Sequence, residues 1–346
     1  MVIKLANGNS LRIDAHVHVL GDGSSGSGCR LGLKAAYHKL LARIIVSSLG
    51  LPSSALSNGL DDLYAQRLVE MVKDSSLDAA IILPHEHVYD SHGRLMENVG
   101  SFYTPNDYVL ALAAKHPNSL IPAAAIHPAR HDAIDELERC AQQGTAVLKL
   151  LPNCQNVDCS DVRFKRFWQR LAELHIPFLC HTGGELSVPV LNAAYADPRT
   201  LTLPLECGVT VIAAHCGTRG LLRDPHYTPA FIEMLGRYPN LYGDNSGMNT
   251  PLRSRYFREI LSPAVQERVI HGSDLPIPIS ALWSLLRGNV SSGGYRRAQS
   301  TSNLIERDVR IKEALGFVPD TFSRIISLLP SPIAKRFQTA PSSSSA

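Results

Sequence analysis

The chain has 346 residues, of which 45% are hydrophobic and 19% charged, and its mean hydropathy is -0.02. This composition excludes a largely disordered chain and is typical of a globular protein with a sizeable core. The net charge of +3 is small, and the basic residues are scattered along the sequence. We therefore expect no nucleic-acid partner, because no basic stripe is available to follow a phosphate backbone.

The most apolar helix candidate, Leu31 to Leu51, contains Lys34, Lys39 and Arg43. Cationic side chains are costly inside a bilayer, so we expect no membrane partner. The first twenty residues contain no apolar run long enough for a secretory signal. The expected location is the cytoplasm.

Seven dispersed cysteines form no CxxC pair: Cys29, Cys140, Cys154, Cys159, Cys180, Cys207 and Cys216. An odd, dispersed set of this kind indicates neither a disulfide framework nor a structural zinc site. We predict buried thiols, because a free cysteine behaves as a small hydrophobic residue.

Eight short β-branched or apolar runs alternate with segments of helical periodicity. They are Leu11 to His18, Ala79 to Pro84, Leu120 to Ile126, Ala146 to Leu150, Pro177 to His181, Thr210 to His215, Leu241 to Asp244 and Arg268 to His271. This alternation is typical of βα units around a parallel sheet, and eight units close a barrel. We therefore predict an α/β fold, a (β/α)₈ TIM barrel, as a single domain over residues 1–330.

Several stretches fall outside this repeating unit. Residues 21–58 begin with a Gly/Ser run and predict an inserted segment after the first strand, lying over the barrel mouth. Residues 289–302 are rich in serine and glycine and predict a mobile loop. Residues 303–329 predict a helical C-terminal extension, and 331–346 a disordered tail.

The first predicted strand ends in the sequence Asp-Ala-His-Val-His, residues 14–18. Because side chains alternate along a strand, His16 and His18 lie on the same face, and both rings can reach one metal ion. Taken alone, such a pair is more often accidental than a metal site.

Four more candidates end or follow other predicted strands. Lys149 ends the fourth strand, His181 the fifth and His215 the sixth, and Asp274 follows the eighth. Barrel enzymes place their sites at this carboxyl end of the strands. Unrelated core residues are not expected to keep such a register, so the set predicts a metal-dependent active site.

Five motifs together resemble the amidohydrolase superfamily, in particular the branch that contains aminocarboxymuconate-semialdehyde decarboxylase and related metal-dependent hydrolases. They are IDAHVH (Ile13 to His18), VLKLLPN (Val147 to Asn153), FLCHTGGE (Phe178 to Glu185), IAAHCGT (Ile212 to Thr218) and HGSDLP (His271 to Pro276). They span most of the chain in the family's order. The combination is specific to the superfamily but says little about the substrate.

The resemblance implies a set of metal ligands, namely His16, His18, His181 and Asp274, with His215 beside them as a second-metal ligand or a catalytic group. Imidazole-rich coordination with one carboxylate suits catalytic Zn²⁺, although Mn²⁺ or Fe²⁺ could also be held. We favour zinc.

Lys149 has two interpretations under this resemblance. In dinuclear relatives, a lysine at the fourth strand is carboxylated and bridges two metals. In mononuclear relatives, it remains a cation that can hold substrate. The KLLPN sequence is compatible with both, and we predict one metal because the motifs are closer to the decarboxylase branch.

Further candidates follow the second and third strands. Most of them, His85 to His87 included, are expected in a solvated loop. Arg130, with His127 near it, is a weaker substrate-binding candidate because a guanidinium group matches a carboxylate. Glu185, four residues after His181, is another weak substrate-binding candidate and could instead orient a ligand.

These residues predict hydrolysis of a small-molecule amide, ester or lactone through a metal-activated water, with Asp274 taking the proton. Nonoxidative decarboxylation of an aromatic or unsaturated carboxylic acid is the alternative, because relatives perform it with much the same ligands. A noncatalytic barrel is disfavoured by the intact set of ligands. The expected partner is a small-molecule substrate. The resemblance also implies a homodimer, since relatives are commonly dimers.

Overall fold

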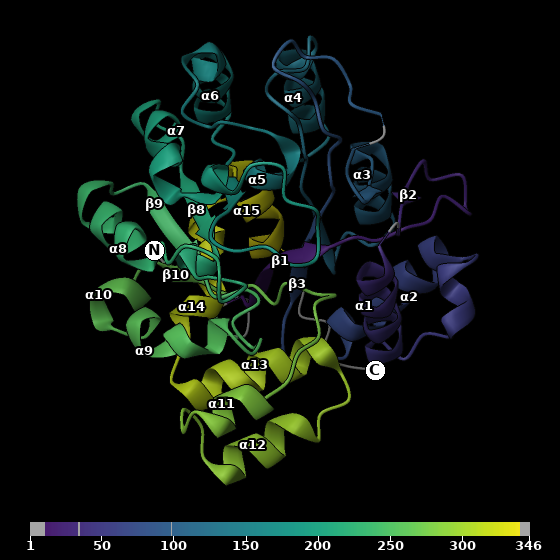
Figure 1. The fold of residues 1–346 in the computed structure, drawn as a ribbon, viewed down its shortest axis with the longest axis vertical. Coiled ribbons are helices and arrows are strands. Elements are labelled where there is room, and N and C mark those ends of the chain that lie inside the picture. The colour runs from purple at the N-terminus through teal and green to yellow at the C-terminus, as the bar shows by residue number, and fades with distance from the viewer. Residues whose placement is uncertain (1–10, 34, 98, 340–346) are drawn as a thin grey trace.

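The computed structural model of the protein describes residues 11–339, except 34 and 98, with helices arranged around central strands (Figure 1). The eight central strands are β1 (Ile13–His18), β3 (Ala79–Leu83), β5 (Leu120–Pro122), β6 (Leu148–Leu150), β7 (Phe178–His181), β8 (Val211–Ala214), β9 (Leu241–Asp244) and β10 (Val269–Ile270). Each lies within one of the eight predicted runs, so the predicted strands are confirmed.

Backbone hydrogen bonds connect these strands in chain order into a closed ring. Strands β1, β3 and β5 pair in parallel, as do β6 to β10. Lys149 N donates to Ala124 O at 2.8 Å across the gap between β5 and β6, and Ala15 N donates to His271 O at 3.0 Å between β10 and β1. The predicted (β/α)₈ TIM barrel is confirmed.

Helices cover the outer face of the ring. They are α2 (Leu60–Lys73), α3 (Asn106–Lys115), α4 (Ala133–Gln142), α6 (Lys165–Glu173), α7 (Thr202–Glu206), α8 (Thr228–Arg237), α9 (Phe257–Ile260), α10 (Pro263–Gln266) and α13 (Leu304–Leu315). The short helix α5 (Pro152–Gln155) follows β6 and packs with Val188 and Phe102 instead. Apolar stripes on the outer helices pack on the strands, as where Trp168 of α6 stacks on Phe178 of β7 with ring centroids 5.0 Å apart. Each fully buried side chain of this size contributes about 1.5–3 kcal/mol.

Short 3₁₀ helices connect several of these elements: η1 (Ser53–Leu56), η2 (Val162–Phe164), η3 (Ala193–Ala196), η4 (Pro198–Leu201), η5 (His215–Gly217), η6 (Arg253–Tyr256) and η7 (Arg324–Leu328). The seven cysteines are free, and all except Cys207 are buried, as predicted. Within the described part of the chain, no helix has both the length and the apolar character needed to cross a membrane.

The C-terminal segment fills one end of the barrel. Ile325 and Ile326 of η7 and Ile333 of α15 (Ser331–Thr339) pack in one cluster with inward-facing strand residues such as Ile13. The predicted helical extension over 303–329 is therefore present as α13, α14 (Asp320–Ser323) and η7.

Two predictions about flexible segments are wrong. The range 331–346 was expected to be a disordered tail, but 331–339 form α15 because Ile333 is buried against the barrel interior; residues 340–346 lie outside the described part. The mobile loop expected at 289–302 contains α12 (Ser292–Gln299), which follows α11 (Leu282–Leu286). Ser291 caps α12 by accepting a hydrogen bond from Gly294 N, and Ala298 is buried.

The segment over 21–58 contributes α1 (Ala36–Ser48) and β2 (Arg30–Leu31), which pairs with β4 (Phe102–Tyr103) from outside the segment. Leu41 and Ile45 of α1 line a cavity that also contains His18 and Asp274. The structure therefore places this segment beside the candidate site.

The Gly/Ser run within this segment is ordered by one carboxylate at the start of α2. Asp61 accepts hydrogen bonds from Asp22 N (2.7 Å), from Ser25 N and Oγ (3.1 and 2.7 Å) and from Ser27 Oγ (2.7 Å). A Cβ atom on Gly21 would lie 2.3 Å from Asp61 Oδ1, so only glycine permits this approach. Burial raises the pKa of Asp61, but the hydrogen bonds from Ser27 and Ser25 outweigh this effect, and the pKa falls to about 2.

We predict that Asp61→Asn destabilises the protein at pH 7 by about 1.5–3 kcal/mol, because hydrogen bonds to a charged group are lost. A carboxyl pKa that is lowered in the folded state stabilises the fold above the unfolded-state pKa, and this stabilisation is lost as the pH falls towards 2. Urea denaturation should therefore show a difference between wild type and variant that narrows from pH 5 to pH 2. The exposed neighbour offers a control, Asp62→Asn; equal effects of the two substitutions would contradict the role of Asp61.

Candidate metal centre

A β-bulge in β1 aims its histidines at the barrel mouth. Asp14 pairs with Ala80 and Val17 with Ile82, so β1 has one extra residue between these pairs. Val17 consequently packs on the outer layer of the barrel. Bulges re-aim side chains in this way, and the Nε2 atoms of His16 and His18 lie 3.2 Å apart.

The carboxylate of Asp274 completes a triangle with these two histidines. Asp274 Oδ1 lies 3.4 Å from His16 Nε2 and 3.5 Å from His18 Nε2. Two ligand atoms on a tetrahedral zinc ion are about 3.3–3.4 Å apart, given bonds of about 2.0–2.1 Å. The three predicted ligands therefore fit one face of such a coordination shell.

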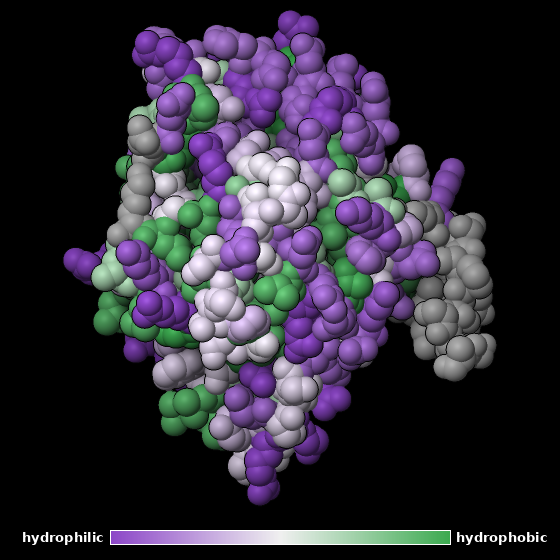
Figure 2. Space-filling view, turned by 90° about the vertical axis from the view of Figure 1, so that its right-hand side faces the viewer, coloured by the Kyte–Doolittle hydropathy of each residue, from purple (hydrophilic) through white to green (hydrophobic). Residues whose placement is uncertain are grey.

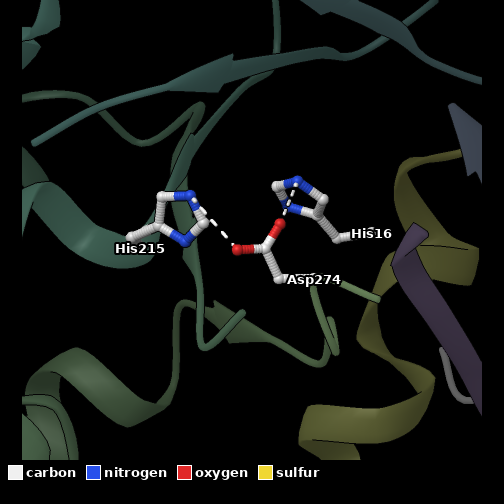
Figure 3. Close-up of side chains that lie close together, drawn as sticks. All are labelled: His16, His215 and Asp274. Carbon is white, nitrogen blue, oxygen red and sulfur yellow. Dashed lines mark ion pairs between the residues drawn. The ribbon is translucent and has the colours of Figure 1, made fainter. Parts of the chain in front are cut away.

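Asp274 also reaches towards His215. Figure 3 shows its carboxylate between the rings of His16 and His215, with one oxygen atom towards each, and Oδ2 lies 4.0 Å from His215 Nε2. One ligand atom from each of these three residues lies within 4.8 Å of the others. Asp274 and His215 both have left-handed backbones, with φ angles of 66° and 62°, a conformation that is uncommon for residues other than glycine and is concentrated at functional sites.

A second carboxylate, that of Asp244 at the end of β9, orients two of the histidines. Asp244 Oδ2 lies 2.7 Å from His16 Nδ1, and Oδ1 accepts hydrogen bonds from His215 N (2.7 Å) and Ser246 Oγ (2.5 Å). His215 Nδ1 in turn lies 2.8 Å from Ser246 O. Because these oxygen atoms can only accept, both Nδ1 atoms carry the proton, and both Nε2 atoms keep the lone pair with which imidazole binds a metal.

The histidines at the site are neutral. Burial, followed by the charge of Lys149, lowers the pKa of His16 well below its ordinary value and that of His18 to about 3. Burial, followed by the charge of Arg253, does the same for His181 and His215. Neutral imidazole is the form that binds a metal.

His181, the fourth predicted ligand, joins this group through His215, with ring centroids 5.0 Å apart. Its Nε2 is buried, has no hydrogen-bond partner among the described residues, and lies 3.6 Å from Glu185 Oε2. Glu185 Oε1 accepts hydrogen bonds from Ser187 N and Val188 N, at 2.5 and 3.0 Å, which fix the carboxylate beside His181. A buried ring nitrogen without a partner fits a group that binds a metal.

Two cations lie beneath the site. Lys149 is buried, and its Nζ lies 3.0 Å from His16 Nε2. Burial lowers its pKa. Arg253, which the sequence analysis missed, is also buried, but its guanidinium group donates to Gly184 O at 2.6 Å and Thr218 O at 3.1 Å.

Of the three weaker candidates, Glu185 lines the cavity that contains His18 and Asp274, whereas Arg130 and His127 do not. Arg130 forms ion pairs with Glu86 at 2.8 Å and Asp132 at 2.7 Å. His127 Nε2 lies 2.9 Å from Gln155 O, and its Nδ1 accepts from Ala129 N. Both residues therefore have structural partners of their own within the protein.

The prediction of a solvated loop at residues 85–87 is wrong for His85 and Glu86, which are buried. His85 pairs with Thr104 through the backbone and stacks on Phe102, with ring centroids 3.9 Å apart. The segment that contains β4 thus covers His85, which the sequence alone showed only as a polar residue.

Fold and site together define a TIM-barrel protein with a candidate metal centre at the carboxyl ends of its strands. A family model described as Amidohydrolase matches residues 13–287. The chain belongs to the amidohydrolase family, whose members are metal-dependent and include both hydrolases and decarboxylases. A comparison with curated protein sequences finds no match.

Solved structures share this fold at low sequence identity. A TIM-barrel protein of uncharacterised function from Bordetella bronchiseptica is 16% identical, with a TM-score of 0.59 over 92% of this chain and 98% of its own. A probable 2-pyrone-4,6-dicarboxylic acid hydrolase from Acinetobacter baumannii is 13% identical, with a TM-score of 0.52 over 95% and 99%. A dihydroxybenzoic acid decarboxylase from Polaromonas, with bound manganese and 2-nitroresorcinol, is 14% identical, with a TM-score of 0.50 over 88% and 96%.

We predict that the isolated protein holds close to one divalent metal ion per chain, with Lys149 uncarboxylated, and that the double substitution His16→Ala/His18→Ala removes most of this metal. Both rings converge at a strand end, so their removal should affect the metal site more than the packing of the hydrophobic core. Elemental analysis measures the metal, and circular dichroism shows that the barrel remains folded. The control is the exposed His92→Ala; unchanged metal content in the double variant, or two ions per chain, would contradict the assignment.

We further predict that Asp244→Asn weakens metal binding by about 10- to 100-fold, the usual effect of losing a group that orients a ligand. Asparagine keeps the shape of the side chain but can present an N–H to His16 Nδ1 instead of an acceptor. Competition with a chelator measures the affinity, and Asp135→Asn, at an exposed position, is the control. Equal affinities would show that the two rings are held without Asp244.

Proposed function

We propose that the protein is a metal-dependent hydrolase of a small-molecule amide, ester or lactone. The observation that carries this proposal is the lining of the cavity at the candidate metal centre. His18, His181, His215 and Asp274 line it, and the described lining residues include no lysine or arginine. A decarboxylase must hold a carboxylate, and beyond the bound metal the described lining residues offer no cationic side chain to pair with that group. A neutral carbonyl compound needs no cationic partner.

Asp274 is the proposed proton acceptor. In the metal-free protein, burial raises the pKa of Asp274 to about 7, against the opposing effects of Arg253 and Lys149. A bound divalent cation would favour the ionised carboxylate, which can accept a proton at neutral pH. A divalent cation, when bound, would polarise the scissile carbonyl group and lower the pKa of a water molecule. The donor set of imidazole nitrogens and one carboxylate supports zinc, with Mn²⁺ and Fe²⁺ as alternatives.

His215 is proposed to assist Asp274. Its Nδ1 is held by Ser246 O, and its Nε2 faces Asp274 Oδ2 at 4.0 Å. A neutral, oriented imidazole in this position can accept a proton and pass it to the leaving group. The same nitrogen would be a ligand if a second metal were bound.

Decarboxylation is the second candidate function, and Lys149 is the observation that favours it. Its buried amine lies 3.0 Å from His16 Nε2 and could pair with a substrate carboxylate. Product analysis separates the two reactions. Hydrolysis of an ester, lactone or amide consumes water and yields a carboxylic acid, whereas 2,6-dihydroxybenzoate would release CO₂. Both substrate groups should be assayed with the metal-loaded protein.

We predict that Asp274→Asn lowers kcat by about 10²- to 10⁴-fold, the usual contribution of general-base catalysis. Asparagine keeps an oxygen donor for the metal but cannot take the proton. The assay uses saturating metal, because asparagine binds metal more weakly than aspartate, and circular dichroism confirms the fold. Turnover within about threefold of wild type would leave Asp274 as a ligand only and would make His215 the candidate base.

A further inference from the structure

The cavity has two chemically different parts. The side chains of the candidate metal centre form one part. The other is built from aliphatic side chains of α1 and the segments beside it, namely Leu31, Leu41, Ile45, Val46, Leu56 and Leu60. A substrate that reaches the metal centre therefore has an apolar wall beside the rest of its body.

Away from the candidate metal ligands, the described side chains that line this cavity offer no cation to an anionic substrate. The acidic residues that line it are Glu185 and Asp274, and the described lining residues include no lysine or arginine. Arg253, the buried guanidinium group nearby, already donates to backbone carbonyl groups. A carboxylate lying against the aliphatic wall would lose its hydration without gaining a partner.

Two buried polar atoms interrupt the aliphatic wall. His38 Nε2 and Ser101 Oγ belong to residues that line the cavity, each 6% exposed, and neither atom has a hydrogen-bond partner among the described residues. An unpaired buried polar atom is costly, so a ligand with a polar group at this point is favoured over a purely hydrocarbon one. A carbonyl or hydroxyl group meets this need.

We propose that the cavity binds an uncharged ester, lactone or amide through an aliphatic chain that lies beneath α1, with Leu41 and Ile45 as the residues that select the chain. The reaction rests on the proposed hydrolase function: water adds across the acyl C–O or C–N bond, and a carboxylic acid and an alcohol or amine result. Binding of the chain is a property of the cavity and can be measured without turnover.

The helix α1 offers a matched control for this proposal. Leu41 and Ile45 line the cavity, whereas their neighbours Leu40 and Ile44 are 58% and 47% exposed. Figure 2 views the molecule from the side on which α1, α2 and α3 lie in Figure 1, and apolar side chains reach the surface there among polar ones. Equal substitutions at Leu40 and Leu41 therefore change the outer and inner faces of one helix.

The first measurement is binding of 2-alkanones, from 2-pentanone to 2-undecanone, to the metal-loaded protein. These ketones are neutral and cannot be hydrolysed, and displacement of the uncharged dye N-phenyl-1-naphthylamine reports their binding. We expect the Kd to fall by up to about fourfold for each added methylene until the cavity is full, which corresponds to the burial of one CH₂ group at about 0.8 kcal/mol. Decanoate is the anionic comparison: binding through the metal should be unchanged in His38→Leu, whereas binding of its carboxylate at the aliphatic wall should be lost in that variant.

The second measurement uses Leu41→Trp, which fills the cavity, and Leu40→Trp as its control. Leu41→Trp should weaken binding of 2-undecanone by at least about tenfold and leave 2-pentanone within about twofold, while Leu40→Trp changes neither. Circular dichroism checks the fold. If the larger side chain prevents folding, Leu41→Ala is used instead, and it should shift the tightest binding to a longer chain.

Two results would overturn the proposal. One is a Kd that does not depend on chain length. The other is tighter binding of decanoate than of 2-undecanone that is lost in His38→Leu, since His38 would then pair with a carboxylate. Failure of the hydrolase function looks different: ketones would bind with the expected chain-length dependence, but p-nitrophenyl decanoate, decanamide and δ-decalactone would not be hydrolysed.

Discussion

The candidate metal centre depends on the hydrogen bonds that the carboxylate of Asp244 accepts. This carboxylate joins the end of β9 to His16 on β1 and to the backbone of His215 after β8, three segments that meet only when the barrel is closed. Without an acceptor at His16 Nδ1, the proton could occupy Nε2, and the nitrogen facing Asp274 would be lost as a ligand. Ring orientation, tautomer and barrel closure are thus linked through one buried side chain.

The barrel also explains why the site has an apolar neighbour. A closed ring of strands leaves two open ends, and each needs a cover. At one end, η7 and α15 insert Ile325, Ile326 and Ile333 into the interior. At the end that carries the candidate metal centre, a cavity is lined by aliphatic side chains of α1. The inserted segment therefore helps to shape the space beside the centre.

Proteins with hydrolase and with decarboxylase activity share this fold, so the barrel by itself does not select the reaction. What distinguishes one member from another is the chemistry of the loops around the centre. In this chain, Arg130 is paired with Glu86 and Asp132, and Arg253 with backbone carbonyl groups, so neither guanidinium group is free for an acidic substrate. The amine of Lys149 lies 3.0 Å from His16 Nε2, within hydrogen-bond distance of a predicted ligand.

The eight strands and the strand-end residues His16, His18 and Asp274 could be predicted from the sequence, because alternation along a strand and position at its end are local properties that a linear pattern records. Arg130 and residues 331–339 misled the sequence analysis because their partners, Glu86 and the barrel interior, are distant along the chain. The role of Asp244 was not predicted for the same reason, because Asp244 and His16 are 228 positions apart in the sequence. Only the tertiary structure could decide these points, because hydrogen-bond partners and burial depend on which segments the closed barrel brings together.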